Sequence, residues 1–240
     1  MTGKYKIFSG SALKLLACIT MLIDHISHVL LIHIPACTEV FLQIENYHIQ
    51  FSVYMIGRYI GRIAFPIYAF LLAEGFQHTH SRKKYALNLL LFALISEIPW
   101  NLEHTGKICY ENQNVFFTLL LGLLCMVCYE KYKNEIKKLF ACLLGLSVIA
   151  LLSKADYGLH GMTFIFLLYL LREQKIPQAV IGASMLSYPV ATGVAFVPIN
   201  LYNHKRGFIH GKFAKYCFYA FYPVHMFVLY LIKLKLYGYE

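Results

Sequence analysis

The chain has 240 residues, of which 59% are hydrophobic and 14% are charged, and its formal net charge is +10. The charged share is about half of that in ordinary soluble domains, and the mean hydropathy is +0.56. A soluble globule of this length needs more polar surface to stay dispersed, so this class is excluded. The length favours a single integral membrane domain spanning residues 1–240.

Apolar segments long enough to be membrane spans recur along the chain, since a spanning helix needs about 20 mostly apolar residues. The predicted segments are Ser9–Ile34, Val53–Phe76, Tyr85–Trp100, Asn114–Tyr129, Leu139–Ser153, Gly161–Leu171, Gln178–Leu201 and Phe213–Leu236. Pro189 and Pro198 interrupt the seventh segment, which either crosses once or forms two short helices that meet at Pro189. The predicted fold is therefore all-α, a polytopic transmembrane bundle of eight or nine spans, some of them short or broken by proline.

The basic residues predict the orientation of the bundle, because cytoplasmic loops are enriched in lysine and arginine. They cluster between the apolar segments at Lys4 and Lys6, Arg82–Lys84, Lys131–Lys138, Arg172 and Lys175, and Lys205–Arg206. These clusters place the N-terminus in the cytoplasm. The loops Ala36–Gln50, Asn101–Gln113 and Lys154–Tyr157 then face outward.

Two other kinds of site find no support. A nucleic-acid surface needs a continuous basic face on a soluble fold, and here the basic residues lie in short, separate clusters. Most of the seven cysteines stand alone in apolar runs, and the pair Cys125 and Cys128 has no second pair to complete a metal ribbon. We predict neither a nucleic-acid partner nor a metal.

The first segment carries polar residues on one helical face. These are Ser11, Lys14, Cys18, His25 and His28, with Met21 among them at the same spacing. Asp24 lies beside this face, one turn before His28 and next to His25. Asp24 and His25 are about 23 Å along the helix from Ser9, which is in the outer half of the membrane. Since a charge at the bilayer centre costs about 3 kcal/mol or more, this placement requires partners.

Other segments bring polar residues to a similar depth. They are Arg58 and Arg62, Glu97, Gln113 and Asn114, and Asp156 and His160. One interpretation is a structural network in which Asp24 and Glu97 neutralise the two arginines. The other is a polar cavity in which His25, oriented by Asp24, acts as a general base or acyl acceptor. Spacing alone does not separate these two interpretations. His225 lies in an aromatic helix beside Pro223, which can open backbone groups to a cavity.

Several segments together resemble the TraX family. They are Ile19–Ile26, Arg62–Phe76, Phe92–Pro99, Gln113–Leu119 and Tyr219–His225. This family is named for an inner-membrane protein of conjugative plasmids that acetylates the N-terminus of F-type pilin. The chain also resembles, more distantly, the membrane acyltransferase 3 superfamily, whose members carry Arg-x10-His in the first helix. Lys14-x10-His25 fits this spacing with lysine in place of arginine, which keeps the charge but loses the bidentate fork.

The resemblance implies a membrane acyltransferase that takes an acetyl group from acetyl-CoA. In that mechanism Lys14 meets the donor's phosphates, together with Arg82–Lys84. His25, oriented by Asp24, deprotonates an amine or hydroxyl, and Arg58 or Arg62 stabilises the oxyanion. The side chains expected to bind the acceptor are Arg58, Arg62, Glu97, Gln113, Asn114, Asp156, His160 and His225. The expected partners are the lipid bilayer, acyl-CoA and an unknown acceptor such as a membrane peptide or pilin.

Two rival functions fit parts of the same pattern. A transporter would use the buried charges as a proton or ion path, and helices broken at Pro189, Pro198 and Pro223 suit it. A non-enzymatic assembly factor for conjugation or pili would not need a buried histidine with an acidic neighbour.

Overall fold

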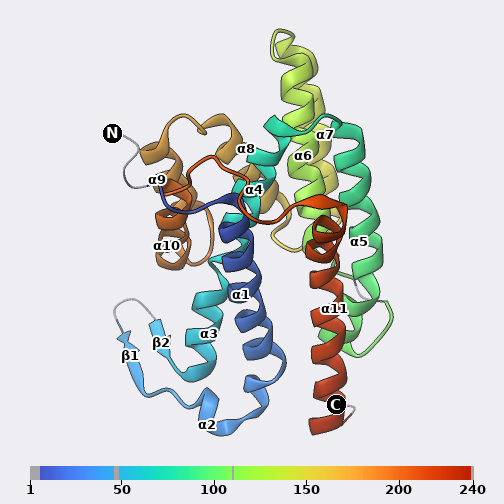
Figure 1. Ribbon diagram of the computed structural model, residues 1–240. Coiled ribbons are helices and arrows are strands. Elements are labelled where there is room, and N and C mark those ends of the chain that lie inside the picture. Colours follow the sequence, from blue (N-terminus) through green and yellow to red (C-terminus); the bar gives the residue numbers. More distant parts are fainter. Residues whose placement is uncertain (1–5, 46–48, 110, 239–240) are drawn as a thin grey trace.

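The computed structural model describes residues 6–45, 49–109 and 111–238, so Lys4 lies outside the described residues. The longer helices are α1 (Gly10–Val29), α3 (Val53–Gly61), α4 (Ala64–His78), α5 (Arg82–Thr105), α6 (Val115–Tyr132), α7 (Ile136–Leu152), α8 (Gly158–Leu170), α9 (Lys175–Met185), α10 (Pro189–Asn200) and α11 (Gly211–Tyr237). Short elements between α1 and α3 are η2 (Leu31–His33), α2 (Pro35–Thr38) and the antiparallel strands β1 (Leu42–Ile44) and β2 (Ile49–Phe51). The predicted all-α bundle is confirmed (Figure 1).

Five helical stretches are long and apolar enough to cross a membrane. They are Gly10–His33, Val53–His78, Arg82–Thr105, Val115–Tyr132 and Gly211–Tyr237. Helices α8 and α10 are apolar but shorter. The chain is therefore a multi-pass membrane protein, while the count of eight or nine spans stays a prediction.

The second predicted span differs from the structure in its continuity, and the third differs in its length. The second is not continuous, because the chain breaks at Arg62 and Ile63 between α3 and α4. The third was predicted to end at Trp100, but α5 continues to Thr105 with Pro99 inside it and ends at Gly106, whose φ is 67°. A proline usually marks a helix boundary because it disfavours the helical conformation of the preceding residue. Here the helix continues past Pro99 and carries Glu103 and His104 into the bundle.

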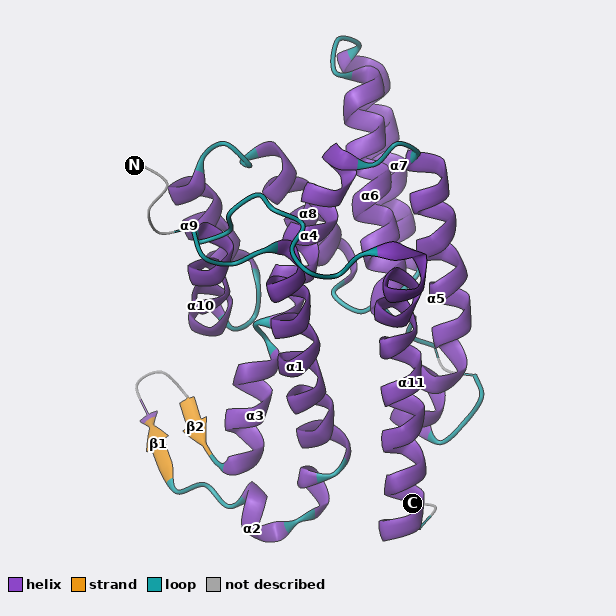
Figure 2. Cartoon of the chain, in the orientation of Figure 1, coloured by secondary structure: helices purple, strands orange, loops and turns teal. Residues whose placement is uncertain are grey.

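Helices α9 and α10 form a hairpin that meets at Pro189, as one of the two sequence alternatives predicted (Figure 2). Its open end is held by Lys175, whose Nζ donates to the Asn200 carbonyl at 3.0 Å. With 11 and 12 residues, each arm is about 17 Å long, roughly half of the hydrocarbon core. Both ends of this hairpin therefore lie on the same side of the bundle.

Helix α1 is central, packing against α3, α4 and α11. Its first turn is tied to the segment that follows α10. Phe8 donates its backbone N–H to Leu201, Gly10 to Lys205 and Ser11 to Arg206, at 2.9–3.1 Å. Two glycines of α3 face α1, and a Cβ added at Gly61 would lie 2.1 Å from the Asp24 Cβ. Small residues four apart let helix backbones approach closely in membranes, and this approach sets the position of the arginines on α3.

Candidate functional site

Asp24 forms the ionic centre of the site. Its Oδ1 lies 3.0 Å from Arg58 Nη1 and 3.6 Å from Arg62 Nη2. All three side chains are at least four-fifths buried, with exposed fractions of 13% for Asp24 and 19% for each arginine. Arg58 lies in α3 and Arg62 is the residue that ends this helix four positions later, so both reach the same carboxylate. The predicted ion pairs of Asp24 with the two arginines are confirmed, and the carboxylate that was expected to orient His25 is therefore engaged by them.

His25 contacts a histidine from the other end of the sequence. Its Nδ1 is 2.6 Å from Nε2 of His225 on α11. His225 is 6% exposed, and its Nδ1 is 2.6 Å from the Phe221 carbonyl oxygen. The His25 ring is only partly buried, and in the described part of the chain its Nε2 has no hydrogen-bond partner. The structure thus brings together two histidines 200 positions apart, with Nε2 of His25 outside the contact between them.

Glu97 is bound to the start of α6 and not to an arginine. Its Oε1 accepts the Asn114 backbone N–H at 3.1 Å and also contacts the Asn114 side-chain amide. Asn114 in turn caps α6, because its Oδ1 accepts the Phe116 N–H at 3.0 Å. The sequence-based alternative in which Glu97 neutralises Arg58 and Arg62 is therefore wrong for this carboxylate.

The segment before α8 lies against the start of α6. Gln113 donates its backbone N–H to Lys154 and accepts that of Asp156, at 3.2 and 2.8 Å. Gln113 therefore contributes main-chain groups to this junction. Burial raises the pKa of the Asp156 carboxyl, and the charge of Arg62 opposes that rise. Burial likewise raises the pKa of Tyr157, whose hydroxyl accepts from Arg62 Nη1 at 3.4 Å.

Four helices begin around these side chains, namely α4, α6, α8 and α10. The first turn of α4 meets the residue before α8, since the rings of Phe65 and Tyr157 stack with centroids 3.9 Å apart. The residue before α10 is Tyr188, whose ring lies 5.4 Å from the Arg62 guanidinium carbon. Helix N-termini carry a partial positive charge. Together with the arginines they make this region favourable for an anion or a developing oxyanion.

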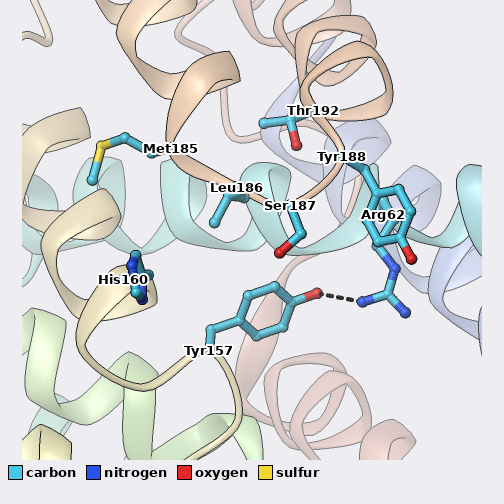
Figure 3. A pocket seen from close by; sticks show the side chains of 8 residues that line it. All are labelled: Arg62, Tyr157, His160, Met185, Leu186, Ser187, Tyr188 and Thr192. Atoms are coloured by element: carbon cyan, nitrogen blue, oxygen red, sulfur yellow. Dashed lines mark hydrogen bonds between the residues drawn. The ribbon is translucent and has the colours of Figure 1, made fainter. Parts of the chain in front are cut away.

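Two cavities of about 400 Å³ open on either side of Tyr157. Figure 3 shows the first, with Tyr157 pointing at Arg62 and with Ser187, Tyr188 and Thr192 from the hairpin tip opposite. His160 is exposed and borders this cavity. The second cavity is lined by Trp100, His104, Asn112, Lys154, Ala155, Asp156 and Tyr157. The tyrosine therefore separates a cationic cavity from one with an acidic wall.

Several residues of the cluster were not predicted. Glu103 is 3% exposed and contacts His104, which packs on Trp100 with ring centroids 3.7 Å apart. The Tyr222 hydroxyl is buried without a hydrogen-bond partner among the described residues. Its electrostatic neighbours are Asp156, Glu103 and Glu97. The sequence signal for Tyr222 was its spacing of three residues from His225 on α11.

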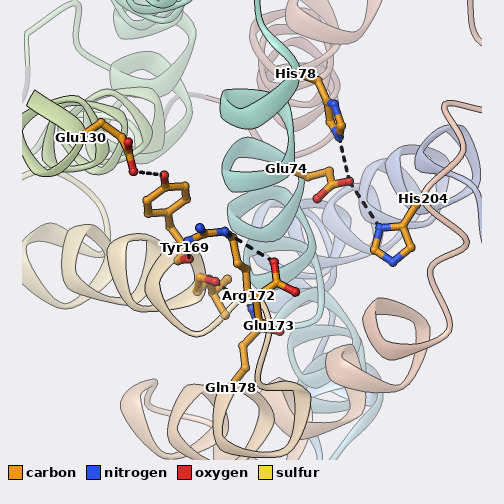
Figure 4. A network of polar contacts seen from close by, with 9 residues as sticks. Glu74, His78, Glu130, Tyr169, Arg172, Glu173, Gln178 and His204 are labelled. Carbon is orange, nitrogen blue, oxygen red and sulfur yellow. Dashed lines mark hydrogen bonds and ion pairs between the residues drawn. The ribbon is translucent and has the colours of Figure 1, made fainter. Parts of the chain in front are cut away.

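Lys14 lies at the opposite end of α1, about 16 Å along the helix from His25. Its electrostatic neighbours include Arg206 and Lys215, so this end of the bundle is basic. A second polar network involves helices α4, α6 and α8 (Figure 4). There Glu74 Oε1 lies 3.3 Å from His78 and 3.7 Å from His204, and Tyr169 donates to Glu130 at 2.6 Å. These groups are separate from the His25 cluster.

Comparison with known proteins identifies the family. A family model described as TraX protein matches residues 9–233. The chain is also 25% identical over 258 aligned positions to the "Probable fimbrial assembly protein FimC, serogroup H1" of Dichelobacter nodosus. That alignment covers 95% of this chain and 97% of the relative. No solved structure matches. Since the model match extends over nearly the whole chain, the chain belongs to the TraX family.

Proposed function

We propose that this protein is a membrane-embedded acyltransferase that moves an acetyl group from acetyl-CoA to an amine or hydroxyl. The observation that carries the proposal is His25, whose Nδ1 contacts His225 and leaves Nε2 outside that contact, with the charge of Arg58 as an electrostatic neighbour. A general base next to fixed positive charge is what acyl transfer needs, because a proton must leave the nucleophile while negative charge develops on the carbonyl oxygen.

The donor enters from the cytoplasmic side of a bacterial inner membrane. Support comes from the basic end of the bundle, where Lys14 neighbours Arg206 and Lys215 and where Arg82–Lys84 begin α5. Phosphate groups favour such clusters of lysine and arginine. Lys14 and His25 share one face of α1, so the phosphates and the thioester of one extended donor can follow the same helix.

In the proposed reaction, His25 Nε2 takes the proton from the acceptor's amine or hydroxyl as that atom bonds to the acetyl carbon. Arg58 or Arg62 stabilises the negative charge on the carbonyl oxygen. The carbon–sulfur bond then breaks, and the proton passes from Nε2 to the leaving thiolate. The products are the acetylated acceptor and coenzyme A as a thiol, and His25 returns to its starting state.

The acceptor lies on the outer side, where the two cavities beside Tyr157 give it room. Of the side chains expected to bind it, Arg62 and His160 line the first cavity and Asp156 lines the second. A peptide or pilin N-terminus fits both the activity implied by the resemblance to the TraX family and the name of the Dichelobacter relative. The protein would thus modify a component of a pilus or conjugation apparatus.

Membranes containing the overproduced protein provide the test, because they hold the protein and candidate acceptors together. Radiolabelled acetyl-CoA is added, and the label incorporated into membrane protein is measured. We expect incorporation with the wild type and with His80→Ala, an exposed histidine in the loop before α5, and loss with His25→Ala. Equal labelling by the wild type and His25→Ala would refute the role of His25, and no labelling above untransformed membranes would refute the activity.

The name of the relative also favours a second candidate, a non-enzymatic assembly factor. The same experiment separates the two, since an assembly factor would support pilus formation in the His25→Ala variant. A transporter that uses the buried charges would instead give saturable ion flux when the purified protein is placed in lipid vesicles.

A further inference from the structure

A continuous set of contacts links the backbone of α11 to His25. The Phe221 carbonyl oxygen contacts His225 Nδ1, and His225 Nε2 contacts His25 Nδ1, each at 2.6 Å. The two imidazole planes are within 12° of each other and their centroids are 4.9 Å apart. This separation is too large for face-to-face stacking at the same N–N distance. The rings therefore lie nearly in one plane, edge to edge, as an N–H···N hydrogen bond requires.

The contacts determine which nitrogen atoms carry protons. A carbonyl oxygen can only accept, so the proton in the first contact belongs to His225 Nδ1. A neutral His225 then has a bare Nε2, which can only accept from His25. The proton in the second contact therefore belongs to His25 Nδ1, and the bare nitrogen of a neutral His25 is Nε2.

We infer that His225 is the positioning residue that fixes His25 in the tautomer whose Nε2 is free to accept a proton. This inference rests on the proposed acyltransferase function. Asp24, which lies next to His25 in sequence, does not fill this role because its carboxylate is paired with Arg58 and Arg62. The group that fixes the tautomer thus comes from α11 and not from α1.

The surroundings of His225 keep its ring in place. It stacks on Phe221 with centroids 4.7 Å apart and meets the edge of Tyr222 at 5.8 Å. During transfer, the proton taken up by His25 Nε2 leaves the imidazole pair with one positive charge. His225 accepts the Nδ1 hydrogen bond of that cation. The same relay that orients the base therefore also stabilises its protonated form.

Nitrogen-15 NMR of the wild-type protein labelled at histidine tests the tautomer directly, with signals assigned by His25→Gln and His225→Gln. We expect His25 at neutral pH with its proton on Nδ1. A His25 signal with the proton on Nε2 would overturn the inference whatever the activity. If the expected tautomer is found and no acetyl transfer occurs in any membrane, only the proposed function fails.

Two variants add a kinetic test. In His225→Gln the side-chain amide reaches the position of Nε2 and can offer an oxygen to His25, whereas the shorter His225→Asn can bond only near Phe221. For a partner that orients a functional histidine, we expect His225→Asn to lower kcat roughly 10- to 100-fold with little change in KM. His225→Gln should restore most of the rate. Equal loss in both variants, with both folded, would show that the ring acts by packing and would overturn the inference.

Discussion

The closest approach between α1 and α3 offers the sharpest test of how the site is built. An alanine at position 61 would place its Cβ 2.1 Å from the Asp24 Cβ, whereas ordinary van der Waals contact begins near 3.4 Å. The helices must then separate by about 1.3 Å unless Asp24 moves. Arg62 Nη2 is already 3.6 Å from Asp24 Oδ1, so the same displacement takes it out of ion-pairing distance.

The energetic effect has two opposing parts. Overpacking of a close contact costs about 1–3 kcal/mol, while replacing a helical glycine by alanine returns about 1 kcal/mol of helix propensity. We expect Gly61→Ala to be destabilised by up to about 2 kcal/mol. We also expect it to lose acetyl transfer, because the arginines move away from His25. Thermal unfolding in detergent and the membrane labelling assay measure the two effects.

Gly145→Ala is the matched control, since it lies in α7 and a Cβ there meets no atom within 4 Å. It should be as stable as the wild type or more so, with unchanged labelling. If Gly61→Ala unfolds at the same temperature as Gly145→Ala and keeps full activity, the close approach of α3 does not position the arginines, and our account of the site is wrong.

Three further predictions concern other parts of the cluster. Asn114→Ala should lose about 1 kcal/mol from the missing helix cap and about 1 kcal/mol from the lost contact of its amide with Glu97, which keeps the backbone N–H of residue 114, seen as a lower unfolding temperature. Burial raises the pKa of Asp156 above its ordinary 3.8, so its contribution to stability is full below pH 3.8 and falls as the pH rises through the higher folded-state pKa. Asp156→Asn should remove that fall in stability. If the variant's unfolding curves between about pH 4 and neutrality match those of the wild type, this prediction is contradicted. Tyr222→Phe should gain about 1 kcal/mol because it removes a buried hydroxyl without a partner, and a lower unfolding temperature would instead mean that the hydroxyl is satisfied.

Helical periodicity was enough to predict much of the cluster. Asp24, His25, Arg58 and Arg62 were expected at one depth because a fixed rise per residue relates sequence position to depth in a spanning helix. The structure brings all four together with His225. Periodicity does not, however, say which face of one helix meets which face of another. The sequence left two roles open for Asp24, which were to orient His25 or to neutralise the arginines, and the structure shows the second.

The misses have local causes. Glu103 and His104 were assigned to an outer loop because the third span was predicted to end at Trp100, yet α5 continues to Thr105. The tip of the α9–α10 hairpin was not predicted to reach the site, because the sequence indicates that two short helices can meet at Pro189 but not which part of the bundle their junction faces. These features depend on tertiary packing, which a single sequence pattern does not encode.

Short elements explain why so many charged groups can lie at this depth. Helix α8 has 13 residues and is about 20 Å long, and each arm of the hairpin is about 17 Å long. All three helices are shorter than a hydrocarbon core of about 30 Å. Their ends, together with the break between α3 and α4, leave backbone groups and cavities around Tyr157 where a continuous helix would have left only apolar side chains. Irregular backbone is tolerated inside a membrane where protein buries it or where it lines a polar cavity. The helix breaks and the buried charges therefore depend on each other. The breaks supply polar groups and space for the charged side chains, and the charged side chains line the cavities where the irregular backbone lies.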